Sequence, residues 1–191
     1  MSENTAPTRE VGGVPLPAAG VWKVDAGHTE VGFVGRHFML TKVRGRFTSV
    51  DATVEVGERP EDSKVTAVIE MKSVDSGDQT RDDHLRSADF FDVEKYPKAT
   101  FTSTSVAWQG TAGTMTGDLT IKDVTRPVTL KVDYLGYARD PWDNDRAVFS
   151  ASGKVNREDW GLTWNMALEA GGILVSKEIE LSLDLETIRQ V

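Results

Sequence analysis

The chain has 191 residues, no cysteine and a net charge of −8, because 30 aspartates and glutamates outweigh 22 lysines and arginines. This negative balance repels phosphate backbones, so we expect no nucleic-acid partner. The lack of cysteine excludes disulfides and thiol nucleophiles, and no stretch approaches the ~20 apolar residues that a transmembrane helix requires. Any contact with membrane lipid is therefore expected to be transient.

The first part of the chain, residues 1–19, shows no hydrophobic periodicity and contains Pro7, Pro15 and Pro17. We expect a flexible N-terminal tail over 1–19, followed by one folded domain over 20–191. The tail also lacks the apolar run of a secretory signal peptide, which predicts a cytoplasmic protein.

Apolar and polar residues alternate through most of the remaining chain, which is the period of a strand with one buried face. The alternation is clearest near the C-terminus, where Ile179, Leu181 and Leu183 are separated by charged or hydroxyl side chains. The expected strands cover 28–38, a segment ending at Val56, 64–72, 98–108, 113–122, 128–134, 146–156 and 178–186.

Turn residues separate these segments at Gly57 to Pro60, Gly110 to Gly113, Arg126–Pro127 and Asp140 to Asp145. Short strands at regular spacing are typical of a barrel or a sandwich. The last strand is too long and regular to be left as an open edge, which favours closure. We therefore predict an all-β fold, an eight-stranded antiparallel barrel.

One segment, 78–87, has the sequence DQTRDDHLRS and no β pattern. Helix formers follow a possible N-cap at Asp78 or Thr80, so we expect a short helix around 78–87. Its residues Arg81, His84 and Leu85 share one face. The helix either covers a barrel mouth or packs outside the barrel as a simple crossover.

The three histidines, His28, His37 and His84, lack the spacing of a metal site, and on a straight strand His28 and His37 would lie on opposite faces. No GxSxG motif singles out a nucleophile. We expect no metal site and no catalytic residues. Gly20-Val21-Trp22 is similar to the Gly-x-Trp that closes the floor of lipocalin barrels, although a tryptophan in any core would look the same.

Five motifs in order resemble the YceI-like family, which binds polyisoprenoids in a lipocalin-like barrel. The motifs are WKVDAGHTEVGFVGRHF (22–38), VRGRFTSVDATV (43–54), RDDHLRSADFFDVEKYPKATF (81–101), TGDLTIKDVTRPVTL (116–130) and VNREDWGL (155–162). The chain departs from the family pattern at Asp123, where glycine is common, and at Trp160, where phenylalanine is common. It also lacks the export signal that many members carry.

The resemblance implies an extended, lipocalin-like barrel of eight antiparallel strands that holds a polyisoprenoid or quinone-type lipid in its lumen, often as a homodimer, with no covalent cofactor. An apolar lumen of this size suits one slender ligand. The expected ligand-binding residues are Val31, Phe33, His37, Phe47, Arg81, His84, Leu85, Phe90, Phe101 and Leu119.

Three functions are open at this point. The first is a carrier or sequestering protein in which His37, Arg81 and His84 hold any polar head group. The second is an enzyme acting on a lipid or small apolar substrate, with His37 or His84 as acid–base groups. The third is a stress-related protein whose barrel is filled by its own side chains. A packed core with ordinary hydrogen bonds explains any single one of these residues equally well.

Overall fold

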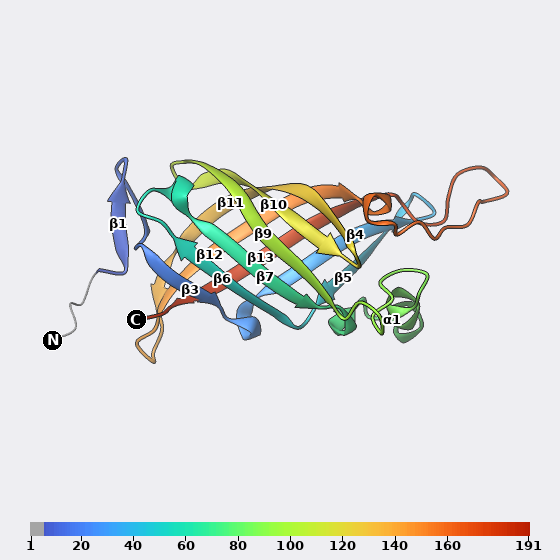
Figure 1. Ribbon diagram of the computed structural model, residues 1–191, viewed down its shortest axis with the longest axis horizontal. Helices are drawn as coiled ribbons and strands as arrows, with labels where there is room; N and C mark the ends of the chain where they lie inside the picture. Colours follow the sequence, from blue (N-terminus) through green and yellow to red (C-terminus); the bar gives the residue numbers. More distant parts are fainter. Residues whose placement is uncertain (1–5) are drawn as a thin grey trace.

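The computed structural model describes residues 6–191, which form a β-barrel with one short α-helix (Figure 1). The strands are β1 (Thr8–Val11), β2 (Val14–Pro17), β3 (Gly20–Val24), β4 (Glu30–His37), β5 (Thr41–Phe47), β6 (Val50–Val56), β7 (Lys64–Glu70), β8 (Val74–Asp75), β9 (Lys98–Gln109), β10 (Ala112–Ile121), β11 (Val124–Arg139), β12 (Asp145–Asn156) and β13 (Glu178–Arg189). The helix is α1 (Gln79–Arg86), and short 3₁₀ turns lie at Ala26–His28, Pro60–Asp62, Met71–Ser73 and Arg157–Trp160.

The barrel closes through β13, which pairs with β12 along one edge and with β3 and β4 along the other. The strand pairs β3 and β4, β5 and β6, and β7 and β8 are each one barrel strand broken by a turn or a short irregular segment. With β9 to β13 they make eight antiparallel strands in simple up-and-down order. The predicted eight-stranded barrel with a short helix is confirmed, and α1 lies within the predicted 78–87.

The prediction of a flexible tail over 1–19 is wrong for Thr8–Pro17, which form a β-hairpin. Its two-residue loop is Gly12-Gly13, with φ of 59° and 81°, the left-handed values that a type I′ turn needs and glycine adopts freely. The Gly-Gly pair was the available signal, but strands of four residues are too short to show alternation. Residues 1–5 of the predicted tail lie outside the described residues.

The hairpin closes one end of the barrel, which we call the floor. Leu16, 4% exposed, packs in one cluster with Trp22, Tyr134 and Ala147. Trp22 is fully buried, and its indole N–H donates to the carbonyl of Ala18 at 3.0 Å. In Figure 1 the hairpin and the C-terminus lie at this end, whereas α1 and the β4–β5 turn lie at the other.

The predicted turn at Arg126–Pro127 is also wrong, because both residues lie inside β11. The chain reverses earlier, at Lys122-Asp123, where Ile121 pairs with Val124. Proline has no N–H to donate to a ladder. It is accommodated here because β11 pairs with β12 only from Lys131 onwards.

No helix within residues 6–191 combines the length and the apolar character needed to cross a bilayer.

If the hairpin is part of the folded unit, Leu16→Ala should lower the free energy of unfolding by about 2–3 kcal/mol, because it leaves a cavity among buried side chains. Urea denaturation followed by tryptophan fluorescence measures this difference. Glu10→Ala, at an exposed position of the same hairpin, is the control and should change stability little. Equal stability of Leu16→Ala and the unsubstituted chain would mean that the hairpin only rests on the barrel.

Candidate functional site

The barrel encloses a cavity of about 660 Å³ whose lining is almost entirely apolar. Inward-facing residues of β13, such as Leu181 and Leu183, line it and stay partly exposed, because they face a void rather than other side chains. One water molecule takes up ~30 Å³ in the liquid, and a methylene group is of similar size. The cavity therefore has room for roughly 20 methylene groups. The alternative of a filled barrel is therefore wrong.

The lumen stays open because large rings lie flat against glycines of the neighbouring strands. Phe33 pairs with Gly45 across β4 and β5, and a Cβ on Gly45 would lie 2.3 Å from the Phe33 ring. In the same way, a Cβ on Gly117 of β10 would lie 2.3 Å from the ring of Phe101 in β9. Each ring covers the barrel wall instead of crossing the lumen.

The cavity opens at the end opposite the floor, which we call the mouth. Most of its lining is buried or partly buried, but Asp78, Thr80 and Arg81, at the start of α1, are exposed and still line it. The carboxylate of Asp78 caps α1 by accepting a hydrogen bond from the backbone N–H of Arg81 at 2.8 Å. The helix therefore lies beside the entrance to the cavity. This agrees with the predicted placement at the barrel mouth rather than with the simple crossover outside the barrel.

An aromatic cluster joins α1 to the loop 161–177 above the mouth. The ring of His84 meets that of Trp164 edge to face at 4.5 Å and that of Phe90 at 5.0 Å between centroids. His84 Nε2 also lies 2.9 Å from Oδ2 of Asp89. These contacts hold the segment after α1 and the loop 161–177 together at the rim.

Arg157 places a buried positive charge at the mouth end of the cavity lining. It is 5% exposed and donates to the carbonyls of Ser176 at 2.9 Å and Leu162 at 2.5 Å, at the two ends of the loop. Burial lowers the pKa of this guanidinium, and Arg157 forms no ion pair with a carboxylate among residues 6–191. Carbonyl dipoles and the ring of Phe90, whose centroid lies 5.9 Å from the guanidinium carbon, surround this charge, which favours an oxygen-bearing group nearby.

All ten residues predicted to bind ligand line this one cavity. They are Val31, Phe33, His37, Phe47, Arg81, His84, Leu85, Phe90, Phe101 and Leu119. That each of them contacts a ligand stays a prediction. The sequence analysis missed Arg157 and Trp164, which carry no periodic signal, and Leu183 and Leu130, whose alternation within 178–186 and 128–134 was visible.

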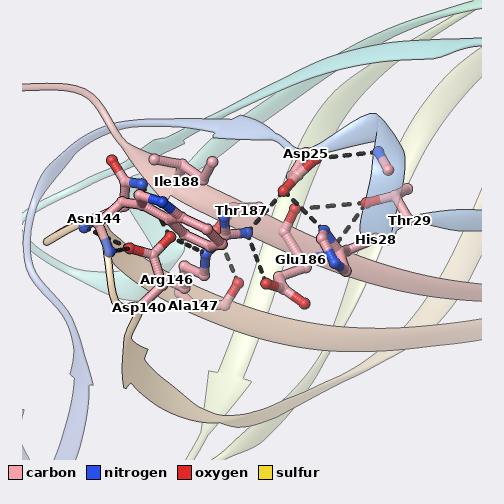
Figure 2. Close-up of polar contacts among 12 residues, drawn as sticks. Asp25, His28, Thr29, Asp140, Asn144, Arg146, Ala147, Glu186, Thr187 and Ile188 are labelled. Carbon is pink, nitrogen blue, oxygen red and sulfur yellow. Dashed lines mark hydrogen bonds and ion pairs between the residues drawn. The ribbon is translucent and has the colours of Figure 1, made fainter.

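His28 lies away from this cavity, in a polar cluster with Asp25 and Glu186 (Figure 2). The three offer potential metal-ligand atoms within 4.8 Å of one another. A guanidinium supplies the positive charge there, because Arg146 Nη1 lies 2.7 Å from both Asp25 Oδ2 and Glu186 Oε1. The absence of a metal site thus stays a prediction.

Arg146 ties three segments together, since its Nε also donates to Asp140 Oδ2 at 2.7 Å (Figure 2). Hydrogen bonds from Arg146, and then from His28, lower the pKa of Asp25 from 3.8 to about 2. Burial alone would raise the pKa of Asp140, but hydrogen bonds from Asn144 and Arg146 outweigh it and hold that pKa well below the ordinary value. The cluster joins β12, β13 and the turn after β3 where the barrel closes.

Acid should weaken this closure. The folded state favours the ionised form of Asp25, so its stabilisation is complete above the unfolded pKa of 3.8 and is lost as the pH falls towards about 2. Urea unfolding at a series of pH values should show this decline. Arg146→Gln should lower the free energy of unfolding at neutral pH by about 3 kcal/mol and flatten the acid decline, because it leaves three carboxylates without their cation.

Arg59→Gln is the matched control, since Arg59 forms a comparable ion pair with Asp62 on the exposed surface. It should change neither the stability nor its pH dependence measurably. An acid decline as steep in Arg146→Gln as in the unsubstituted chain would place the responsible carboxylates elsewhere.

Comparison with known proteins agrees with this barrel. A family model described as a YceI-like domain matches residues 22–187. Protein YceI of Salmonella newport (strain SL254) is 38% identical over 175 residues, covering 90% of this chain and 88% of that relative. The crystal structure of BcnA from Burkholderia cenocepacia is similar with a TM-score of 0.74 at 24% identity, over 85% of this chain and 98% of that chain.

A further similar structure is that of a polyisoprenoid-binding domain from Saccharophagus degradans implicated in plant cell wall breakdown. Its TM-score is 0.65 at 16% identity, with 88% of this chain and 98% of that chain covered. At this identity the likeness shows a shared fold.

Proposed function

The chain belongs to the YceI-like domain family, and from that premise we propose that it carries or sequesters one long apolar lipid of the isoprenoid or quinone type inside its barrel. The observation that carries the proposal is the apolar cavity of about 660 Å³, open beside α1. Burying a hydrocarbon chain there contributes about 0.8 kcal/mol per methylene, so affinity needs no covalent bond. The polyisoprenoid-binding domain from Saccharophagus degradans, which shares the fold, supports this ligand class.

The head group of the lipid would lie at the mouth. His37, Arg81 and His84 line this end of the cavity, together with the buried Arg157. Cationic and imidazole N–H groups donate to hydroxyl, carbonyl or phosphate oxygens. The polar end of the ligand would therefore face solvent, and its chain would run towards the floor.

We propose a non-catalytic role, because holding a hydrocarbon chain in an apolar cavity requires no bond to be made or broken. Turnover of a candidate substrate that His37→Ala or His84→Ala abolishes would favour the enzyme alternative instead. The cytoplasmic location stays a prediction.

Native mass spectrometry after gentle purification, followed by organic extraction, is the most direct test. We expect a bound mass that extracts as an isoprenoid or quinone-type lipid, with one molecule per chain. The same spectra report the oligomeric state, for which we expect a homodimer. A protein that is ligand-free in every preparation and takes up no prenyl lipid when mixed with it would contradict the proposal.

Filling the lumen should abolish ligand retention. Ala67 lies on the inner face of β7, opposite Ala52 of β6 and Phe101 of β9, so Ala67→Trp places an indole across the cavity. We expect at least a tenfold loss of retained lipid per folded protein by extraction, with circular dichroism unchanged. Thr66→Trp, on the exposed outer face of the same strand, is the matched control and should retain the lipid fully.

A further inference from the structure

We infer that the mouth end of the barrel docks on the surface of an anionic lipid bilayer. This inference rests on the proposed function, since a lipid carrier has to meet the membrane that holds its ligand. The docking surface consists of an apolar rim, formed by Phe38, Met39, Leu40 and Met166, and an adjacent basic patch, formed by Arg36, Lys42 and Arg44.

The apolar rim exposes large side chains where a soluble turn normally carries polar ones. Leu40 is 80% exposed, Met166 57%, Met39 49% and Phe38 48%. Four neighbouring exposed apolar residues at one end of a protein typically mark an interaction surface. Their place at the cavity mouth makes lipid the natural occupant.

The backbone of the β4–β5 turn is strained in a way that presents these side chains outward. Phe38 and Met39 have φ of 54° and 60°, the left-handed region that costs ~1–2 kcal/mol for a residue with a Cβ. Glycine or asparagine would relieve that strain. Strain at an exposed apolar turn is expected where function requires these side chains.

The rim is continuous with the lip of the cavity. The backbone N–H of Phe38 donates to the carbonyl of Leu174 at 2.9 Å, and His37 forms a β-bridge with Val175. His37, Leu174 and Val175 all line the cavity. A lipid leaving a bilayer in contact with the rim would therefore pass from one apolar surface directly to another. In Figure 1 the β4–β5 turn and the long loop extend beyond the barrel at this end.

The basic patch identifies an anionic surface as the partner. Arg36 and Lys42 are directly paired across β4 and β5, a like-charge pair that destabilises a sheet, and Arg44 follows on the same outer face. None of the three forms an ion pair with a carboxylate in the part of the chain that the structure describes. The carboxylates of β13 on this face near the mouth are Glu178, which Lys154 engages at 3.0 Å, and Glu180, which is paired with Val34 of β4. This local positive charge stands out in a chain whose net charge is −8.

Apolar side chains beside unpaired basic ones are the combination that binds the interface of anionic membranes. The loop 161–177 carries two charged residues of opposite sign, Glu169 and Lys177, so it opposes this attraction little. A protein partner or a second copy of the chain would also cover the rim, but a lipid surface fits best because the rim is continuous with the lip of the apolar cavity.

Cosedimentation with vesicles tests the inference on the full-length protein. We expect binding to vesicles of equal parts phosphatidylglycerol and phosphatidylcholine, weakened by salt, and much less binding to phosphatidylcholine alone. Leu40→Asp should weaken binding roughly 10- to 100-fold, because one leucine side chain is no longer buried in lipid. Lys42→Gln with Arg44→Gln should weaken it roughly 30-fold.

The matched controls lie at other parts of the surface. Trp142→Asp replaces an apolar side chain that is 78% exposed in the turn between β11 and β12, and Lys23→Gln with Lys64→Gln removes two exposed charges from β3 and β7. All should bind vesicles as the unsubstituted chain does. Because the rim residues are exposed, their variants should fold normally, which circular dichroism checks.

Equal binding of the Leu40→Asp variant, or no vesicle binding by the unsubstituted chain, overturns the inference. Conversion of a dimer to a monomer by Leu40→Asp in sedimentation velocity, with vesicle binding unaffected, also overturns it and assigns the rim to a second copy. The Ala67→Trp variant separates the two proposals, since it should dock on vesicles without retaining lipid. Vesicle binding by a protein that never contains lipid would contradict the proposed function and leave the docking inference standing.

Discussion

The structure depends on one packing constraint, which is that the inward side chains of an eight-stranded barrel are kept from filling it. A barrel of this size has room either for its own side chains or for one slender ligand. Here the rings of Phe33 and Phe101 lie against Gly45 and Gly117 in the barrel wall. The small residues Ala52 and Ala67 are paired directly on the adjacent strands β6 and β7. The resulting void of about 660 Å³ leaves its lining without the packing contacts that a filled barrel would make.

The two ends of the barrel have different roles. At the floor, the hairpin with Leu16 and the buried Trp22 close the lumen, and the ion cluster around Arg146 fixes the seam where β12, β13 and the turn after β3 meet. At the mouth, polar groups line an opening beside α1, and the exposed apolar side chains of the β4–β5 turn and of Met166 lie next to it. In the proposed function a lipid enters at the mouth, with its hydrocarbon chain towards the floor and its polar end at the mouth.

The sequence allowed most of the barrel to be predicted, because apolar and polar residues alternate along strands with one buried face, most clearly over 178–186. The lining residues within strands followed from the same alternation, and helix formers after an N-cap at Asp78 or Thr80 placed α1. The predictions that failed concern segments that are short or that lack periodicity. The Gly12-Gly13 hairpin has strands too short for a pattern, and Pro127 resembles a turn residue although β11 tolerates it. Trp164 reaches the cavity only through the tertiary path of the loop 161–177, and Arg157 only through the 3₁₀ turn that follows β12, and neither residue belongs to an alternating pattern.

The central claim is that the void itself sets the affinity, so its most direct test is calorimetric titration with prenyl alcohols of increasing length. Burial of each added isoprene unit should strengthen binding at one site per chain and make the heat capacity change more negative, until the lumen is full at roughly 20 carbons. Beyond that length affinity should level off. Affinity that does not depend on chain length, or the absence of saturable binding, would contradict the account.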